Sequence, residues 1–547
     1  MRFDMPKGEF VIPSGIVAST PDIIWRISKE IDEIGVITTK SIGLAERDGN
    51  KEPIISCVGG SMVNAVGLSN PGVDSFLAEV GAAHSQLSRD GKVLMISIFG
   101  GTPTEFAELA AKVEKHTDWI ELNLSCPHAQ GYGAAIGTCP GTVSEVVSAV
   151  RGAVAADMPV FAKIVPSLGL AGLVARQAEH AGADGITAVN TVGPLSFSDP
   201  TIGIPLLSNV VGGLSGSAIR EVALKCVREV RESTSVPIIG MGGIGTGDDV
   251  SAFRLAGASL FGIGTALTSM STVSMKSYFR SLASGSAFPF GLAGLIWSKL
   301  QVKEVWGNST RVLVLDGRMG ASPGQFVFLW IPGVGEKPFS LAFNDPITLL
   351  VKAIGPVSSH IASLCEGSEV MLRGPYGNGY APSGSACLVG GGSGVAPVYF
   401  IAKGYKDKVE AAFIGGRKSD DLPLYDSLKG LTETSASTED GSLGHRGLVT
   451  EILCAERYQG AEFFNCGPEP MLVRVAEQEC RATDPSKIFC AVERYTKCGV
   501  GICGSCALDG YRTCVDGPVF PYLILKEGKD FGKCKRRASG RLVPLNG

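Results

Sequence analysis

Four cysteines near the end of the chain stand at a spacing that suits a metal centre. Cys498, Cys503 and Cys506 follow the pattern C-x4-C-x2-C, and Cys514 comes after seven further residues. This spacing is typical of a [2Fe–2S] cluster, and the glycines between the cysteines would let the backbone approach an inorganic core closely. A structural zinc ion or simple packing of thiols are the alternatives. Since such a cluster only moves single electrons, the rest of the chain has to supply a donor and an acceptor.

Composition limits the classes of protein that the chain can belong to. Its 547 residues suggest roughly three to five domains, and a net charge of -4 with 19% charged residues argues against nucleic-acid binding. Fifteen cysteines without a secretory signal pattern indicate reduced thiols and a cytoplasmic location. No run of about eighteen apolar residues predicts a membrane span.

The first part of the chain alternates apolar, β-branched runs with amphipathic segments. This repeat predicts a (β/α)8 barrel within residues 1–290, with its chemistry at the C-terminal ends of the strands. Glycine-rich turns after the seventh and eighth strands predict a phosphate site there. The eight expected strands cover residues 15–20, 35–41, 93–100, 120–126, 160–166, 185–190, 237–244 and 260–267.

Seven motifs in this part give a specific resemblance. "TTKS", "NAVGLSNPG", "ELNLSCP", "VNT", "GGLSG", "GMGGI" and "GIGTA", in this order, resemble the flavin mononucleotide (FMN) barrel of dihydroorotate dehydrogenases over about residues 10–285. The resemblance implies a flavin site made of Ser19, Lys40, Ser41, Asn123, Lys163, Val189, Gly216, Gly242, Gly243, Gly264 and Thr265. It implies a substrate site made of Lys40, Asn64, Ala65, Val66, Gly67, Leu68, Asn123, Asn190 and Thr191.

Oxidation of a dihydropyrimidine needs a base on one side of the ring and a hydride acceptor on the other. Cys126 follows a strand end and is the candidate base, because a thiol can act near neutral pH where its thiolate is favoured. Lys40 can neutralise a substrate carboxylate or the charge of a reduced flavin. Asparagine amides offer both donors and acceptors to a pyrimidine edge. His128 stands where many relatives have asparagine and is interpreted as a loop residue.

The second part of the chain resembles ferredoxin reductase-like proteins. We expect an antiparallel β-barrel that binds flavin adenine dinucleotide (FAD) over residues 299–383, an α/β domain that binds NAD over 384–485, and a 2Fe-2S domain over 486–547, whose basic tail we expect to be a solvated extension. The resemblance implies FAD contacts from Lys337, Pro338, Phe339, Ser340, Lys352 and Ser358. It implies NAD contacts from Gly391, Gly392, Gly394, Cys466 and Gly467.

The two parts together predict one function. Residues 299–520 resemble the electron-transfer subunit of the NAD-linked class of dihydroorotate dehydrogenase, which relatives carry as a separate chain. The resemblance implies oxidation of dihydroorotate to orotate, with electrons passing from FMN through the cluster to FAD and NAD, in a dimer that assembles through the barrel. A dihydropyrimidine dehydrogenase acting on uracil or thymine and a non-enzymatic electron carrier are the alternatives. The first usually has an acidic residue near the position of Val66, which "NAVGL" lacks.

Overall fold

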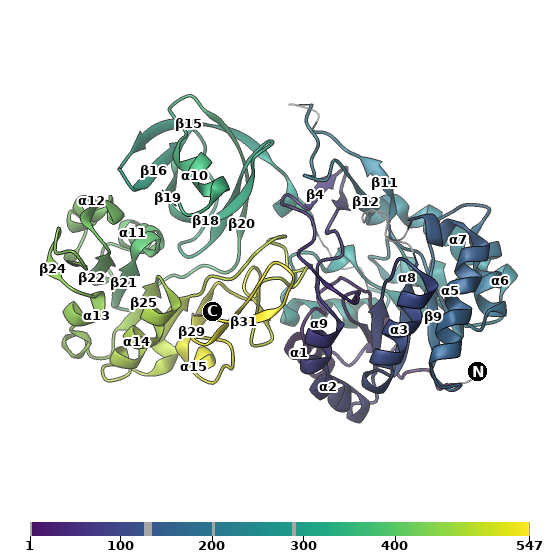
Figure 1. The fold of residues 1–547 in the computed structure, drawn as a ribbon. Helices are drawn as coiled ribbons and strands as arrows, with labels where there is room; N and C mark the ends of the chain where they lie inside the picture. Colours follow the sequence, from purple (N-terminus) through teal and green to yellow (C-terminus); the bar gives the residue numbers. More distant parts are fainter. Residues whose placement is uncertain (1–2, 125–133, 200–202, 287–290, 546–547) are drawn as a thin grey trace. The chain divides into compact units, whose positions relative to one another are not determined.

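The computed structural model describes residues 3–124, 134–199, 203–286 and 291–545. The chain forms two compact units (Figure 1). The first contains residues 1–295, 500–510 and 536–542, and the second contains residues 296–499, 511–535 and 543–547. Within the described residues, no helix is both long enough and apolar enough to cross a bilayer.

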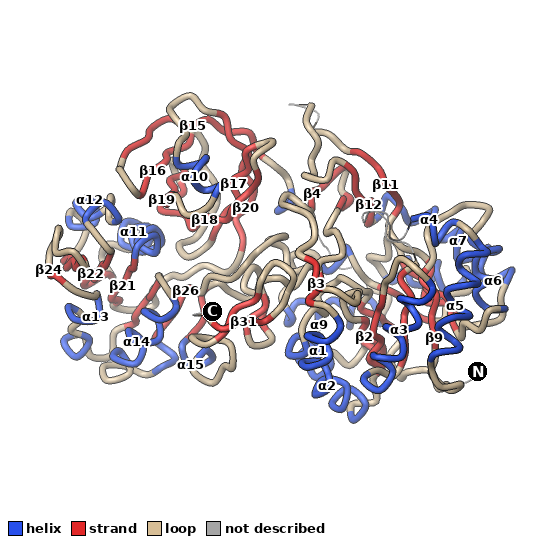
Figure 2. The backbone as a smooth tube through the Cα atoms, in the orientation of Figure 1, coloured by secondary structure: helices blue, strands red, loops and turns tan. Residues whose placement is uncertain are grey.

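A closed barrel of eight parallel strands forms the centre of the first unit, among the residues described there (Figure 2). Its interior is filled from nearly every strand, for example by Val36, Trp119 and Phe161, as expected for a packed (β/α)8 core. The predicted fold class is therefore confirmed. In spatial order the strands are β1 (Phe10–Ile12), β14 (Leu260–Gly262), β13 (Ile238–Met241), β10 (Gly185–Ala188), β9 (Val160–Lys163), β8 (Trp119–Asn123), β7 (Val93–Ile98) and β2 (Ile34–Thr38).

The first predicted strand was wrong. Residues 15–20 do not form a strand, and β1 lies upstream, where Phe10, Val11 and Ile12 are fully buried and pair with β2 and β14. Gly15 and Val17 have positive φ angles of 78° and 61°, so this apolar run turns instead of extending. The other seven predicted strands each overlap a barrel strand.

Helices surround the barrel and begin at recognisable caps. Thr20 caps the first helix by accepting a hydrogen bond from the Ile23 amide, and Thr102 caps another in the same way, each followed by proline. Thr20 therefore has a structural role at the start of the first helix. The helices are α1 (Pro21–Glu30), α2 (Val73–Arg89), α3 (Pro103–Val113), α4 (Ala134–Thr138), α5 (Pro140–Ala153), α6 (Ala171–His180), α7 (Arg220–Ser233), α8 (Gly247–Leu255) and α9 (Thr272–Ala283).

Loops of the barrel carry smaller sheets. An antiparallel sheet of β11, β12, β5 and β4 has its own apolar cluster of Val63, Ala65 and Leu207. It places Asn64 opposite Gly213, so the predicted substrate stretch follows a rigid strand. The strands of these sheets are β3 (Glu46–Arg47), β4 (Ile55–Val58), β5 (Ser61–Asn64), β6 (Asn70–Pro71), β11 (Val192–Ser196) and β12 (Val211–Ser215).

The second unit begins with a closed antiparallel barrel, as predicted. Alternate residues such as Leu313, Leu329 and Leu349 are fully buried and fill it. Its strands are β15 (Ser298–Trp306), β16 (Thr310–Leu315), β19 (Ile347–Lys352), β18 (Gly335–Asn344), β17 (Phe326–Ile331) and β20 (Glu369–Tyr376), and α10 (Pro356–Ala362) follows β19.

A seven-stranded sheet, built entirely from described residues, follows this barrel. Its strands are parallel except for the last pair. The expected boundary at residue 486 does not separate two sheets, because β26 and β29 lie beyond it and complete this one. The strand order is β24 (His445–Arg446), β23 (Glu433–Thr438), β22 (Val409–Gly416), β21 (Ala386–Gly391), β25 (Glu462–Cys466), β26 (Ile488–Ala491) and β29 (Val519–Pro521). The helices are α11 (Val395–Gly404), α12 (Tyr425–Lys429), α13 (Val449–Ile452), α14 (Glu469–Glu479) and α15 (Tyr522–Leu525).

The basic C-terminal tail is not the solvated extension that its composition predicts. Strands β30 (Cys534–Arg536) and β31 (Leu542–Pro544) pair with each other, and residues 536–542 pack in the first unit. Ser539 is fully buried and Arg536 is only 8% exposed. Carboxylates of the barrel unit bind the tail, so its charge is compensated within the protein.

Candidate active site and electron-transfer sites

Three predicted site residues meet at the C-terminal ends of barrel strands. The Asn123 amide donates to the Ser41 hydroxyl at 2.9 Å, and Asn190 Nδ2 lies 3.4 Å from Asn123 Oδ1. Ser41 also lies 2.9 Å from Ser97 Oγ. Because β2, β8 and β10 all end at this face of the barrel, hydrogen bonds between residues 56 to 82 positions apart form one polar network.

Lys163 is held by a carboxylate that the sequence motifs did not single out. Lys163 Nζ lies 3.7 Å from Glu121 Oε1, with the two side chains 6% and 0% exposed. The same oxygen accepts a hydrogen bond from Ser97 at 2.9 Å, while Glu121 Oε2 is buried and has no hydrogen-bond partner among the described residues. A charged residue inside the apolar strand "WIELN" was the available signal. Burial of a charged side chain is costly unless an opposite charge lies beside it.

The predicted phosphate glycines form a cradle. Gly216, Gly242 and Gly243 have φ angles of 95°, 121° and 85°, which favour glycine. A Cβ on Gly243 would lie 2.8 Å from the Gly216 carbonyl oxygen, and one on Gly216 would lie 3.3 Å from Thr265. The turn after the seventh strand thus packs closely against Gly216, which itself lies close to Thr265 after the eighth strand. This arrangement fits the phosphate of a flavin nucleotide.

The predicted substrate stretch is a tight turn after β5. Gly67 and Leu68 have positive φ angles of 78° and 54°. Asn50 fastens the turn, since its side chain donates to the Ala65 carbonyl at 3.0 Å and its amide donates to the Val66 carbonyl at 3.0 Å. Asn50 was not predicted from the sequence.

Two further parts of the predicted substrate site have different outcomes. Asn190 Oδ1 accepts from the Thr191 amide at 2.8 Å, so these neighbours have a fixed geometry. Cys126 and His128 lie outside the described residues. The assignment of Cys126 as the base therefore stays a prediction.

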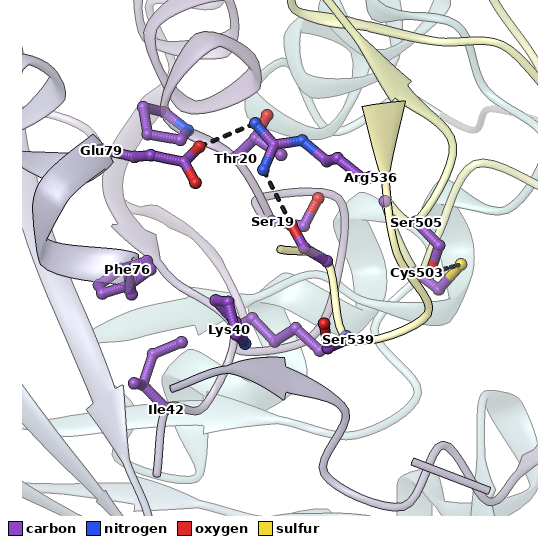
Figure 3. Close-up of a pocket in the computed structure, with 14 residues that line it drawn as sticks. Ser19, Thr20, Lys40, Ile42, Phe76, Glu79, Cys503, Ser505, Arg536 and Ser539 are labelled. Carbon is purple, nitrogen blue, oxygen red and sulfur yellow. Dashed lines mark hydrogen bonds and ion pairs between the residues drawn. The ribbon is translucent and has the colours of Figure 1, made fainter. Parts of the chain in front are cut away.

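Lys40 and Ser19 line one pocket of the first unit, together with Cys503, Arg536 and Ser539 (Figure 3). Ser19 Oγ is buried and has no hydrogen-bond partner in the structure, so it is available to a bound group. A Cβ on Gly504 would overlap the Ser19 hydroxyl. The cysteine loop therefore needs glycine at this position to pass Ser19, a predicted flavin contact.

The expected FAD residues lie on β18 and beside it. Lys337, Pro338, Phe339 and Ser340 form part of β18 and pair with β17. Lys352 donates instead to the buried Asp421 at 2.7 Å. Burial, the largest single effect, would raise the pKa of Asp421, but the hydrogen bonds and charges of Lys352 and Arg417 together outweigh it and the pKa is lowered.

Ser358, the last expected FAD contact, caps its own helix. It accepts from the amides of Ile354 and Gly355 at 3.1 and 3.0 Å. Lys352 and Ser358 therefore both have protein partners, and their contact with FAD stays a prediction.

The expected nicotinamide residues come together at the end of β21 and β25. Gly392 has a φ of 56°, and a Cβ on Gly394 would overlap the Cys466 carbonyl oxygen. A Cβ on Gly391 would lie 2.5 Å from Met471 Sδ. Burial raises the pKa of the Cys466 thiol to about 12, so the thiol stays neutral. The bare glycine backbone fits the approach of a dinucleotide.

The four predicted cluster ligands are Cys498, Cys503, Cys506 and Cys514. All four are buried, at 7% exposure or less, and the intervening Gly499, Gly501 and Gly504 have positive φ angles. Among the described residues, no three His, Cys, Asp or Glu side chains are grouped as metal ligands. Buried thiols in a glycine loop fit a cluster chemically, and the ligand assignment stays a prediction.

Arg373 is a buried cation that sequence reasoning missed. It donates to the carbonyl oxygens of Cys498 at 2.8 Å and Lys497 at 3.3 Å, and Glu336 balances its charge at 3.1 Å. Burial, the largest single effect, would lower the pKa of Arg373, but the charges and hydrogen bonds of Glu336 and Tyr376 together outweigh it and the pKa is raised. Arg373 therefore stays charged and holds the backbone at the first cysteine of the loop.

Comparison with known proteins agrees with this architecture. The dihydroorotate dehydrogenase family matches residues 6–284, and the iron–sulfur cluster binding domain of dihydroorotate dehydrogenase B matches residues 493–526. The catalytic subunit of dihydroorotate dehydrogenase B (NAD(+)) from Methanocaldococcus jannaschii is 43% identical over 47% of this chain and 83% of its own length. The corresponding subunit from Pyrococcus abyssi is 42% identical over 51% of this chain and 89% of its own length.

The remainder of the chain has a different relative. A probable electron transfer subunit of dihydroorotate dehydrogenase B (NAD(+)) from Pyrococcus horikoshii is 40% identical over 45% of this chain and 98% of its own length. The fold and sites thus define a barrel oxidoreductase joined to a reductase module with an iron–sulfur domain. The chain belongs to the dihydroorotate dehydrogenase family, and it joins in one polypeptide what these relatives carry as separate subunits.

Proposed function

We propose that this chain oxidises dihydroorotate to orotate and transfers the electrons to NAD. The observation that carries the proposal is that one polypeptide aligns with 83% of a catalytic subunit and with 98% of an electron transfer subunit of the same NAD-linked enzyme. The electron path runs from FMN in the first barrel through the 2Fe-2S cluster to FAD and then to NAD. The single chain keeps both halves at equal stoichiometry.

The residues have distinct roles in this reaction. Asn123 and Asn190 present amide donors and acceptors to the pyrimidine, and their mutual hydrogen bond fixes both. Lys40 supplies positive charge to the carboxylate or the flavin. Cys126 takes the proton from the ring carbon, as the resemblance implies. When bound, FMN accepts the hydride, the cluster relays single electrons, and FAD exchanges a hydride with NAD.

The binding sites follow from the fit of the residues present. The cradle of Gly216, Gly242 and Gly243 would hold the FMN phosphate, and Lys163 would meet the ring system beside Glu121. The four cysteines 498, 503, 506 and 514 would hold the cluster. Lys337 to Ser340 would contact FAD, and the loop from Gly391 to Gly394 would contact NAD.

The proposal extends to assembly and location. A dimer that forms through the barrel, as the family resemblance implies, and a cytoplasmic location are part of it. The supporting observations are the mildly acidic composition with reduced thiols and the lack, in the described part of the chain, of a helix suited to a bilayer.

Flavin reduction under anaerobic conditions tests the substrate. Dihydroorotate should bleach the barrel flavin far faster than dihydrouracil, because Lys40 and the Gly67 and Leu68 amides can meet a carboxylate. Equal rates, or faster bleaching by dihydrouracil, would refute the orotate assignment and favour a dihydropyrimidine dehydrogenase. No bleaching by either compound, while NADH still reduces the second flavin, would favour an electron carrier.

A further inference from the structure

The C-terminal segment Arg536–Arg541 is built into the barrel unit. Residues 536–542 belong to the first unit, whereas residues 511–535 and 543–547 on either side belong to the second. Ser539 is 0% exposed and Arg536 is 8% exposed. Of the three arginines of the segment only Arg536 is buried, and a buried arginine needs a partner for its charge.

Two carboxylates of the barrel unit anchor the segment. Glu46 accepts hydrogen bonds from Ser539 Oγ at 2.6 Å and from Arg541 Nη1 at 3.0 Å. Glu79, on α2, accepts from Arg536 Nη2 at 2.9 Å. Arg536 also donates to the Gly540 carbonyl oxygen at 2.9 Å, which closes the segment into a loop. The hydrogen bond from Ser539 is the largest cause that lowers the pKa of Glu46.

The anchored segment reaches Lys40 through one serine. Ser69 Oγ donates to the Ala538 carbonyl oxygen at 2.9 Å and accepts from Lys40 Nζ at 3.4 Å. Ser69 is 0% exposed. A hydroxyl has a single hydrogen, so its commitment to Ala538 turns the oxygen lone pairs toward the Lys40 ammonium. The position of the Ala538 carbonyl therefore determines how the Ser69 oxygen faces Lys40 Nζ.

The same segment forms part of the pocket wall. Arg536, Ser539 and Gly540 line the pocket that Lys40 and Ser19 also line (Figure 3). The pocket lies at the C-terminal ends of β1 and β2, where the chemistry of this fold takes place. Arg536, Ser539 and Gly540 are thus part of the wall of the pocket that contains Lys40.

We propose that Arg536–Arg541 is a positioning segment for Lys40, which it orients through Ser69 and shields from solvent. The proposal rests on the proposed function for the part that Lys40 plays toward flavin and substrate. It makes a segment near the C-terminus of the chain a component of the dihydroorotate site. Lys40 itself touches the reactants, and the segment acts through it.

Two variants test the segment at different points. Arg541→Gln removes an exposed anchor and should leave the fold intact, because the Arg541 side chain is 49% exposed. Ser69→Ala removes the link itself. Arg254→Gln is the matched control, since it breaks another exposed arginine–glutamate pair of the same barrel, with Glu9. Arg541→Lys is the conservative variant that should restore the anchor.

The first readout is the labelling of Lys40 by acetic anhydride, followed by mass spectrometry without substrate. Lys40 should react several-fold faster in Arg541→Gln and Ser69→Ala than in the wild type, and at the wild-type rate in Arg254→Gln. The second readout is single-turnover flavin reduction over a range of dihydroorotate concentrations. The limiting rate should fall by about tenfold in Ser69→Ala, the scale of one hydrogen bond to a charged group. In Arg541→Gln the fall should be smaller and reversed by Arg541→Lys.

The outcomes separate this proposal from the proposed function. Wild-type labelling of Lys40 together with wild-type limiting rates in both variants would overturn the positioning role. Faster labelling in the variants, with a wild-type enzyme that dihydroorotate does not reduce, would keep the positioning role and refute the dihydroorotate assignment. A limiting rate of flavin reduction that falls in Arg254→Gln as well would show that breaking any exposed ion pair of the barrel slows the reaction. This result would also overturn the proposal.

Discussion

The guanidinium of Arg373 lies 2.8 Å from the carbonyl oxygen of Cys498 and connects the core of the antiparallel barrel to the first cysteine of the loop. The ring of Phe328 stacks against it with its centroid 4.2 Å away, and the Tyr376 hydroxyl accepts from it at 2.7 Å. All three guanidinium nitrogens of Arg373 thus donate hydrogen bonds to groups of the protein. We infer that Arg373 fixes the backbone that presents Cys498.

Removal of Arg373 should lower the stability of the protein and, as a second and separable effect, speed the loss of the cluster. Arg373→Met should cost about 3–5 kcal/mol in the free energy of unfolding, because the buried Glu336 would lose the cation that balances its charge. The double variant Arg373→Met with Glu336→Leu should recover most of this loss. It should still release iron to a chelator faster than the wild type, since the carbonyls of Lys497 and Cys498 would lack their donor.

Urea unfolding and the rate of iron release check this prediction. Arg457→Gln, which breaks the exposed pair with Glu433 in the same unit, is the control and should change neither quantity appreciably. Wild-type iron release from the double variant would show that Arg373 serves only to balance Glu336.

The phosphate cradle predicts a contrast between two glycines with similar backbone angles. Gly243→Ala should weaken FMN binding by at least about tenfold, a loss of ~1.4 kcal/mol, because the new Cβ would press on the Gly216 carbonyl oxygen and on Arg220. Gly91→Ala, at a φ of 67° with open space around it, should cost stability alone. Flavin fluorescence titrations measure both affinities, and equal FMN affinities would contradict the cradle.

Glu479 predicts a pH-dependent stability of the second unit. This carboxyl is fully buried, and burial raises its pKa well above the ordinary value although Asn465 donates to it at 2.7 Å. The folded state therefore keeps a proton that the unfolded state releases. The resulting destabilisation is absent below the unfolded pKa and grows as the pH rises toward the folded pKa.

Glu479→Gln removes this titration. The variant should exceed the wild type in free energy of unfolding by more at pH 8 than at pH 5, as measured by urea unfolding at each pH. A difference that is the same at both pH values would mean that Glu479 is not protonated in the folded state.

The order of the barrel elements could be predicted from the sequence because local patterns determine it. β-branched runs that end in polar residues identified seven strands and placed Ser41, Asn123 and Asn190 at one face. The first strand was missed because only three residues form it, while the longer apolar run after it contains Val17 at a φ of 61°. A run of apolar residues does not reveal a positive φ.

Long-range partners explain most of what the sequence did not predict. The tail was expected to be solvated because its composition is basic, but the carboxylates that bind Arg536 and Ser539 lie 457 and 493 residues away in the sequence. The pairing of Arg373 with Glu336 could not be predicted either, because the two residues lie in different strands, β20 and β18. Only Glu121 gave a local signal, as a charge within an apolar strand.

The assigned base predicts a selective loss of the first half-reaction. Cys126→Ala should retain both flavins and slow flavin reduction by dihydroorotate by a factor on the order of 10² or more, the usual effect of losing a positioned base. Reduction of the second flavin by NADH should be unchanged and serves as the internal control. Near-wild-type reduction by dihydroorotate would move the role of base to another residue, with His128 and Cys139 as the next candidates.

The central claim is that one chain couples dihydroorotate oxidation to NAD reduction through the cysteine loop, and Cys506→Ala tests it most directly. The variant should lose the visible absorption of the cluster, while dihydroorotate still bleaches the barrel flavin in a single turnover and NADH still reduces the second flavin. Coupled turnover from dihydroorotate to NAD, measured in the same preparation, should collapse. Rapid coupled turnover in a variant shown to lack iron would contradict the account, because the electrons would then pass between the flavins without the cluster.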